Sequence, residues 1–195
     1  QTLLMSELAH RTKNLMAIVS SLVSQTARGA ASLDTYVSEL QARLSSLATA
    51  QTILVRAQWQ PTPLQALIRD IVGLHCPADR PILVVTGPDP MVPAKAVLNL
   101  SLIFHELATN SVKYGALSRS GGSLEITVRT TDANAPRIHL TWRERCETPC
   151  PDSGSVGFGT RLIEASVRHD LRGEVTRRFE PSGLVYEMDF PNDPS

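Results

Sequence analysis

The spacing of apolar residues divides the chain into two parts with different patterns. Residues 1–57 contain no proline, and their leucines recur at intervals of seven, four and three residues. This spacing places apolar side chains in one stripe along a helix. The segment ARGAAS interrupts it, where Gly29 can end one helix and Ser32 can cap the next. The pattern predicts a helical hairpin whose second flank needs a partner. The stripe consists of Leu8, Leu15 and Leu22, then Leu33, Val37, Leu40, Leu44, Leu47 and Leu54.

The pattern changes beyond WQPTP, residues 59–63, because two prolines cannot continue a helix. The later segments mix helical periodicity with strands that alternate apolar and polar residues. We therefore expect an α+β fold, with a helical hairpin over residues 1–58 and helices on a largely antiparallel sheet over residues 59–195. The segments that define the second part are LQALIRDIVGLH, PILVVTG, AKAVLNLSLIFHELATNSVKYG, GSLEITVRTT, RIHLTWRE, RLIEASVRHDL and the hairpin GEVTRRFEPSGLVYEMDF.

Composition argues against several classes of partner and site. The 19 Lys and Arg residues balance 19 Asp and Glu residues, so no electrostatic argument points to nucleic acid or an anionic membrane as partner. No apolar run approaches the roughly 18 residues that span a bilayer. Three cysteines favour reduced thiols and a cytoplasmic location. Cys146 and Cys150 have no second pair to complete a zinc site. Because Gln1 begins inside a predicted helix, we expect a piece of a longer protein.

His10 lies off the leucine stripe on a helical wheel, so a buried core histidine is disfavoured. A solvated surface histidine and a phosphoryl acceptor both remain open. An acceptor needs a neutral, reachable ring nitrogen on a rigid element. Glu7 and Asn14 lie one turn to either side, where a carboxylate can orient the ring or take up its proton.

A second set of polar residues recurs along the long helix of the second part, with spacings of seven, four and three residues. These spacings put Asn99, Glu106, Asn110 and Lys113 on one narrow arc. An ordinary solvated face is one interpretation, although such faces usually carry more long charged side chains. Amide and carboxylate oxygens suit Mg²⁺ and its waters, and a lysine suits phosphate, so a metal–phosphate site is the other.

The segment SGSVGFGT brings Gly157 and Gly159 to the start of a helix. Backbone amides can approach a phosphate there, and the helix N-terminus favours an anion. A lone Gly-x-Gly is more often a turn, and no Walker lysine follows it.

Taken in order, these motifs resemble sensor histidine kinases of the HWE and closely related group along the whole chain. ELAHRTKNLMAIV is similar to the phosphoacceptor box, FHELATNSVKYGALS to the N box, and GFGTRLIEASVRHDLRGEV to the glycine box. LTWRE supplies the Trp-x-Glu motif. The three letters of the group name would map to His105, Trp142 and Glu144.

The resemblance implies a dimerisation and phosphotransfer hairpin followed by an α/β-sandwich, Bergerat-type ATP-binding domain. It implies that the γ-phosphoryl group of Mg-ATP passes to His10 and then to an aspartate of a response-regulator receiver domain. It further implies a homodimer and an upstream sensor domain outside this chain. The implied site residues are His10 and Glu106 for catalysis, Asn110 as Mg²⁺ ligand, and Asn110, Lys113, Tyr114, Glu144, Gly157, Gly159 and Thr160 for the nucleotide.

One segment departs from the group. RERCETPCP follows Trp-x-Glu, whereas glycines and a proline are usual there, and Cys146 and Glu147 take positions of glycine. This departure keeps a second function open, an ATP-independent histidine phosphotransfer or phosphatase module with a degenerate catalytic domain. A Bergerat-type ATPase unrelated to signalling is the third, and the His10 hairpin disfavours it.

Overall fold

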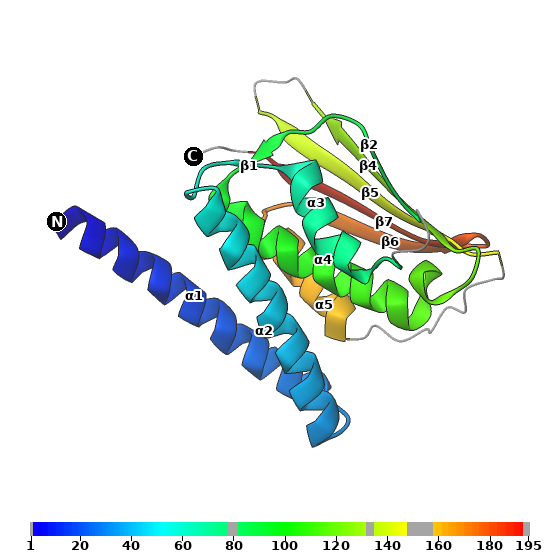
Figure 1. Cartoon of the computed structure of the whole chain (residues 1–195), viewed down its shortest axis with the longest axis horizontal. Helices are drawn as coiled ribbons and strands as arrows, with labels where there is room; N and C mark the ends of the chain where they lie inside the picture. Colours follow the sequence, from blue (N-terminus) through cyan, green and yellow to red (C-terminus); the bar gives the residue numbers. More distant parts are fainter. Residues whose placement is uncertain (1, 78–81, 132–134, 148–157, 193–195) are drawn as a thin grey trace. The chain divides into compact units, whose positions relative to one another are not determined.

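The computed structural model describes residues 2–77, 82–131, 135–147 and 158–192 (Figure 1). The chain divides into two compact units, Gln1–Ser45 and Ser46–Ser195. The division falls inside the second helix, upstream of the boundary at 58/59 that the prolines indicate. The boundary at 58/59 stays a prediction, and the two units are described separately.

The first unit contains helix α1 (Thr2–Gly29) and the first part of helix α2 (Leu33–Arg56). α1 ends at Gly29 as predicted. Ser32 caps α2 as predicted, since its Oγ accepts a hydrogen bond of 3.1 Å from the backbone N–H of Thr35. The hairpin also contains a buried polar contact that an apolar pattern does not reveal. Arg43 donates a hydrogen bond of 2.9 Å to Oγ1 of Thr26 on the other helix.

The second unit is built on a five-stranded sheet in the order β2-β4-β5-β7-β6. β2 pairs with β4 in parallel and the other neighbours are antiparallel. Helices α3, α4 and α5 cover one face of the sheet (Figure 1), so the predicted α+β class is confirmed. The elements are β1 (Thr62–Pro63), α3 (Leu64–Val72), β2 (Leu83–Thr86), β3 (Met91–Val92), α4 (Ala94–Tyr114), β4 (Ser123–Thr130), β5 (Arg137–Arg145), α5 (Phe158–Ala165), β6 (Glu174–Glu180) and β7 (Gly183–Pro191).

Short turns connect several of these elements. β1 and β3 pair with each other outside the main sheet. Helical turns follow α3 at Gly73–His75, α4 at Ala116–Ser118 and α5 at Ser166–Asp170.

Within the described residues, no helix is both long enough and apolar enough to cross a membrane.

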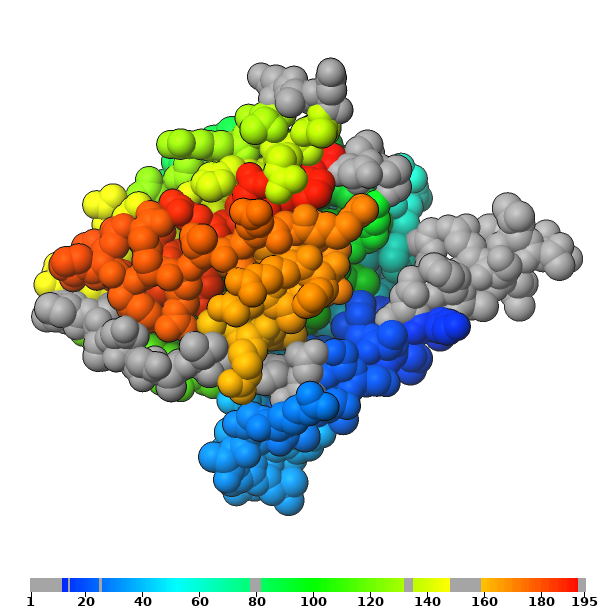
Figure 2. Space-filling view, turned by 180° about the vertical axis from the view of Figure 1, so that it is seen from behind, coloured from blue at the N-terminus to red at the C-terminus, as the bar shows by residue number. Residues whose placement is uncertain are grey.

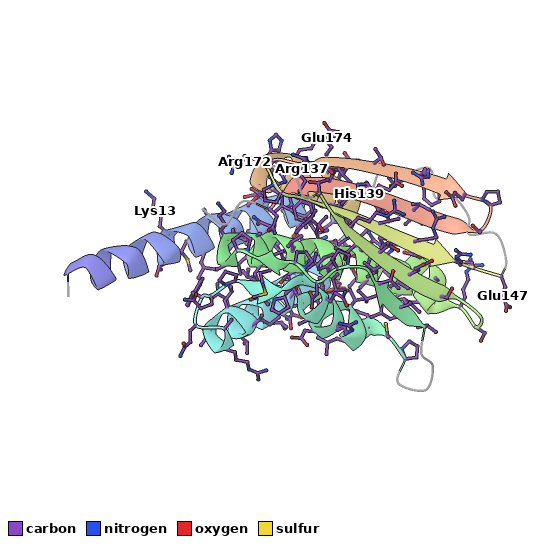
Figure 3. The ribbon with its side chains drawn as sticks, turned by 90° about the horizontal axis from the view of Figure 1, so that it is seen from above. Lys13, Arg137, His139, Glu147, Arg172 and Glu174 are labelled. Carbon is purple, nitrogen blue, oxygen red and sulfur yellow. The ribbon has the colours of Figure 1, made fainter. Side chains whose placement is uncertain are left out.

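Alternation along the strands separates the core from the solvent. In β5, Leu140 and Trp142 face the helices and are fully buried, whereas Arg137 and His139 lie on the helix-free face of the sheet (Figure 3). Ion pairs cross that outer face, such as Arg178 with Glu187 at 2.6 Å and Arg143 with Glu180 at 2.6 Å. Exposed pairs of this kind add little stability, so most of the stability of the fold comes from the contacts on the buried face.

Candidate functional site

Two motifs that lie about 50 residues apart in the sequence meet where α5 packs on α4. Glu106 and Asn110 stand one turn apart on α4, and Gly159 is in the first turn of α5. A Cβ atom on Gly159 would lie 2.7 Å from Oε2 of Glu106 and 3.2 Å from Nδ2 of Asn110. The absence of a side chain at residue 159 therefore lets the backbone of α5 approach these two polar groups.

The polar arc on α4 runs from the interior of the unit to its surface. Glu106 is only 5% exposed, Asn99 and Asn110 are half-buried, and Lys113 is exposed at the end of the helix. Tyr114 is 65% exposed beside it. The interpretation as an ordinary solvated face is therefore wrong for Glu106.

This arrangement suits a cation that completes its coordination shell with ligands from outside the protein. Among the described residues, no group of three or more His, Cys, Asp or Glu side chains could hold a metal ion. Mg²⁺ commonly takes one or two protein oxygens and completes its shell with water and phosphate oxygens. The oxygens of Glu106 and Asn110 fit that donor set, and the nearby Lys113 can neutralise a phosphate.

Glu144 is buried at the end of β5, where it is 1% exposed. It follows Trp142 by two residues, so strand alternation directs it toward the helices. Its Oε1 accepts a hydrogen bond of 3.0 Å from Nε1 of Trp142, and its Oε2 accepts one of 2.8 Å from the backbone N–H of Ala116. Burial raises the pKa of Glu144, while the hydrogen bonds from Trp142, Ala116 and Ser111 act to lower it.

Gly115 provides the space for this carboxylate. A Cβ atom on Gly115 would overlap Oε2 of Glu144, so a side chain at this residue, which directly follows α4, would have to displace the carboxylate. Glu144 consequently joins the end of β5 to the turn after α4. Its predicted hydrogen bond to the adenine amino group stays a prediction.

Thr160 faces the sheet and is 7% exposed. Its Oγ1 accepts a hydrogen bond of 3.0 Å from Nη1 of Arg177 on β6. Figure 2 shows α5 and β6 side by side on the surface where this contact joins them. Sequence reasoning missed Arg177, although a charged residue at an inward position of an alternating strand is a signal that could have identified it.

Three predicted features lie partly or wholly outside the described residues. His10 belongs to α1, but its side chain is outside the described part, so its predicted exposure stays a prediction. Lys13, one turn further along, extends away from the helix (Figure 3). Gly157 and Cys150 are also outside. Cys146 is disulfide-bonded, so the expectation of reduced thiols from an odd cysteine count was wrong for this residue, because a count does not show which side chains meet.

His105, which would supply the first letter of the group name, packs against another histidine. Its ring is 5.1 Å from that of His75 in an edge-to-face arrangement. Burial lowers the pKa of His75, so the neutral form is favoured there. His105 therefore sits beside the helical turn Gly73–His75 that follows α3, and nothing in this contact assigns it a chemical role.

Comparisons with known proteins agree with the resemblance. Residues 7–89 match the family described as HWE histidine kinase. The chain is 33% identical over 189 residues to a blue-light-activated histidine kinase of Rhizobium johnstonii, covering 97% of this chain and 53% of that protein. It is 30% identical over 195 residues to a protein of the same name from Brucella ovis, covering 100% of this chain and 40% of that protein.

Solved structures show the same fold. The histidine kinase domain of a blue-light activated histidine kinase from Erythrobacter litoralis has a TM-score of 0.59 at 15% identity, covering 90% of this chain and 94% of that one. Histidine kinase ThkA in complex with response regulator protein TrrA has a TM-score of 0.50 at 15% identity, covering 98% of this chain and 61% of that one. The family match over residues 7–89 and the two relatives aligned along nearly the full length of this chain thus both show a similarity to HWE and blue-light-activated histidine kinases.

Proposed function

We propose that this chain is the core of a sensor histidine kinase, which transfers the γ-phosphoryl group of Mg-ATP to His10 and then to an aspartate of a response regulator. The observation that carries the proposal is the approach of Gly159 to Glu106 and Asn110. It joins the glycine box to the N box in a chain similar to HWE histidine kinases, and the donor set suits a metal–phosphate group.

Each residue has a defined task in this proposal. A neutral ring nitrogen of His10 attacks the γ-phosphorus, the bond from that phosphorus to the bridging oxygen breaks, and ADP leaves. Glu106 takes up the proton that the ring releases. Asn110 would ligate Mg²⁺, which would supply positive charge against the phosphates, and Lys113 would contact them as a point charge. Tyr114 packs against the nucleotide, Glu144 binds adenine, and Gly157 and Gly159 form the hinge of the segment that covers it.

The partners follow from the same similarity and from the exposed hairpin. ThkA was solved in complex with response regulator protein TrrA, which supports a receiver domain as the second acceptor here. Leu33 is 75% exposed and Val37 is 43% exposed, so part of the apolar stripe is left for a second copy of the hairpin, as in a four-helix bundle.

The chain spans about half the length of the Rhizobium relative, which supports a sensor domain outside it. We place this core in the cytoplasm.

Incubation with γ-labelled ATP and Mg²⁺ tests the proposal. The label should be acid-labile and base-stable, as expected for phosphohistidine. His10→Gln should abolish it, and Asn110→Ala should abolish the Mg²⁺-dependent reaction while leaving the fold intact. His169→Gln, which changes an exposed histidine, is the matched control and should keep the label. Label that persists on His10→Gln would contradict the assignment of His10.

The ATP-independent phosphotransfer module stays as the second candidate because of the segment after Glu144. Cys146 and Glu147 stand where the group usually has glycine, and Cys146 is disulfide-bonded. This candidate predicts that a phosphorylated receiver domain labels His10 without ATP, in a protein that binds no nucleotide. Binding of Mg·ADP to the parent chain would exclude it.

A further inference from the structure

We infer that Arg177 is a positioning residue of the nucleotide site, which holds Thr160 and thereby fixes the first turn of α5 against Glu106 and Asn110. The inference rests on the proposed function, because that function places the nucleotide between α4 and the glycine box. It also assigns Thr160 an anchoring task, since its hydroxyl faces the sheet.

Arg177 lies on the helix-facing side of β6, an edge strand of the sheet. The register places it opposite Tyr186 on β7, which in turn lies opposite Trp142 on β5. Its neighbour Arg178 belongs to the outer face and pairs with Glu187 there. A single strand therefore carries one arginine toward α5 and the next toward solvent.

The guanidinium group of Arg177 is held from two directions. Its Nη1 donates to Oγ1 of Thr160 at 3.0 Å, and its Cζ lies 4.9 Å from the ring centroid of Phe179 on the same face of the strand. A planar cation stacked on an aromatic ring has few alternative positions. The arginine is thus a defined donor for Thr160.

The hydroxyl of Thr160 also has a second partner. Tyr186 is almost fully buried and shares a side-chain hydrogen bond with Thr160 and another with Arg177. Three side chains from α5, β6 and β7 therefore form one polar cluster beneath the first turn of α5. A buried cluster of this kind specifies one arrangement of the elements that meet in it.

The cluster of Arg177, Thr160 and Tyr186 adjoins Gly159, the residue on which the proposed site depends. Thr160 directly follows Gly159, whose backbone approaches Glu106 and Asn110. Buried apolar residues such as Leu162 and Ile163 hold α5 on the unit, but apolar contact is not directional. The hydrogen bond from Arg177 supplies a direction, and small displacements of groups around a phosphate lower binding and rate strongly.

The test measures the affinity for Mg·ADP, the apparent KM for ATP and the maximal labelling rate for a set of variants. Arg177→Met and Thr160→Val, which is close to isosteric, should each weaken Mg·ADP roughly three- to tenfold. The double variant should be no weaker than either single variant, because both remove the same contact. Thr160→Ser keeps the hydroxyl and should bind as the parent does. Arg178→Met is the matched control and should leave Mg·ADP affinity unchanged.

Two results would overturn the inference while the proposed function stands: parent-like affinity of both Arg177→Met and Thr160→Val, or losses that add in the double variant. If Arg177→Met does not fold, the comparison of Thr160→Val with Thr160→Ser decides. A parent chain that binds Mg·ADP but does not label His10 would overturn the proposed function and leave the inference standing. A parent chain that binds no nucleotide would overturn both.

Discussion

The indole Nε1 of Trp142 donates a hydrogen bond of 3.0 Å to Oε1 of Glu144, two residues further along β5. Both side chains are essentially inaccessible to solvent, at 0% and 1% exposure. The other carboxylate oxygen accepts from the backbone of Ala116, just beyond α4. The tryptophan and glutamate that name the family therefore form one structural unit in this chain, which ties the sheet to the end of the helix that carries Asn110.

We expect Trp142→Phe to lower the free energy of unfolding. Phenylalanine keeps an aromatic ring in the core but leaves Oε1 of Glu144 without its donor, which costs about 1–3 kcal/mol, and the smaller ring adds a cavity cost. Urea unfolding of the parent and the variant measures the sum. In a Glu144→Met background only the cavity cost should remain, so an equal loss in both backgrounds would contradict a role for the hydrogen bond.

The buried Glu144 should also make stability depend on pH. Burial raises its pKa in the folded chain above the ordinary value of 4.5. Between that value and the raised pKa, the folded chain holds a proton on Glu144 that the unfolded chain has released. The stability from neutral Glu144 is therefore present at low pH and is lost as pH rises through this window. Relative to Glu144→Gln, the parent should lose stability as pH rises, and a pH-independent difference would contradict the raised pKa.

Glu144→Ala separates base recognition from support of the fold. If the carboxylate accepts a hydrogen bond from the adenine amino group, its loss should weaken ATP by about ten- to a hundredfold. GTP should change little, since guanine presents an acceptor at that position. Titration of both nucleotides measures the difference. Equal losses would mean that Glu144 acts only through Trp142 and Ala116.

Gly159→Ala should impair the site more than the fold. Its new methyl group would lie 2.7 Å from Oε2 of Glu106, the end of a flexible side chain, so the carboxylate can move away at small cost in stability. The displaced group should lower the labelling rate roughly ten- to a hundredfold. Gly73→Ala is the matched control, because nothing lies within 4 Å of the added Cβ atom. A Gly159→Ala variant that labels as the parent does would contradict the role of this close approach.

The elements of the fold that are local in sequence could be predicted. Ser32 caps α2 and Gly115 follows α4 because capping and helix ends depend on a few adjacent residues. The parallel pairing of β2 with β4 was not predicted, since it joins segments that lie about 40 residues apart. Val112 of α4 is apolar and yet 42% exposed, which shows that the burial of a helical residue depends on the elements around it as well as on its type.

In the candidate site, too, the features that depend on one element could be predicted, whereas the contacts between elements could not. Spacing put Glu106 and Asn110 on one face of a helix, which is a property of the helix alone. The hydrogen bond from Ala116 to Glu144 could not be predicted, because Ala116 contributes only its backbone N–H, and every residue type except proline carries one. The contact of Arg177 with Thr160 depends on how α5 packs on the sheet, which no local pattern encodes.

The division of the chain inside α2 leads to a prediction about fragments. Residues 46–56 belong to the second unit, and within it Leu54 and Ala50 are fully buried while Leu47 is 6% exposed. Ser46 also donates a hydrogen bond of 3.4 Å to the backbone carbonyl of Ser101 on α4. A fragment that begins at residue 59 loses these contacts, and each buried leucine contributes about 1.5–3 kcal/mol.

We expect fragments 46–195 and 59–195 both to fold and bind Mg·ADP, with 46–195 unfolding at a clearly higher urea concentration. Leu54→Ala in the longer fragment should remove about 2–5 kcal/mol of the difference, whereas Val55→Ala, at a position that is 62% exposed, should change little. The comparison fixes where the catalytic unit begins, since the end of α2 is either part of its core or part of the linker. Equal stability of the two fragments would support the boundary at 58/59 that the prolines indicate.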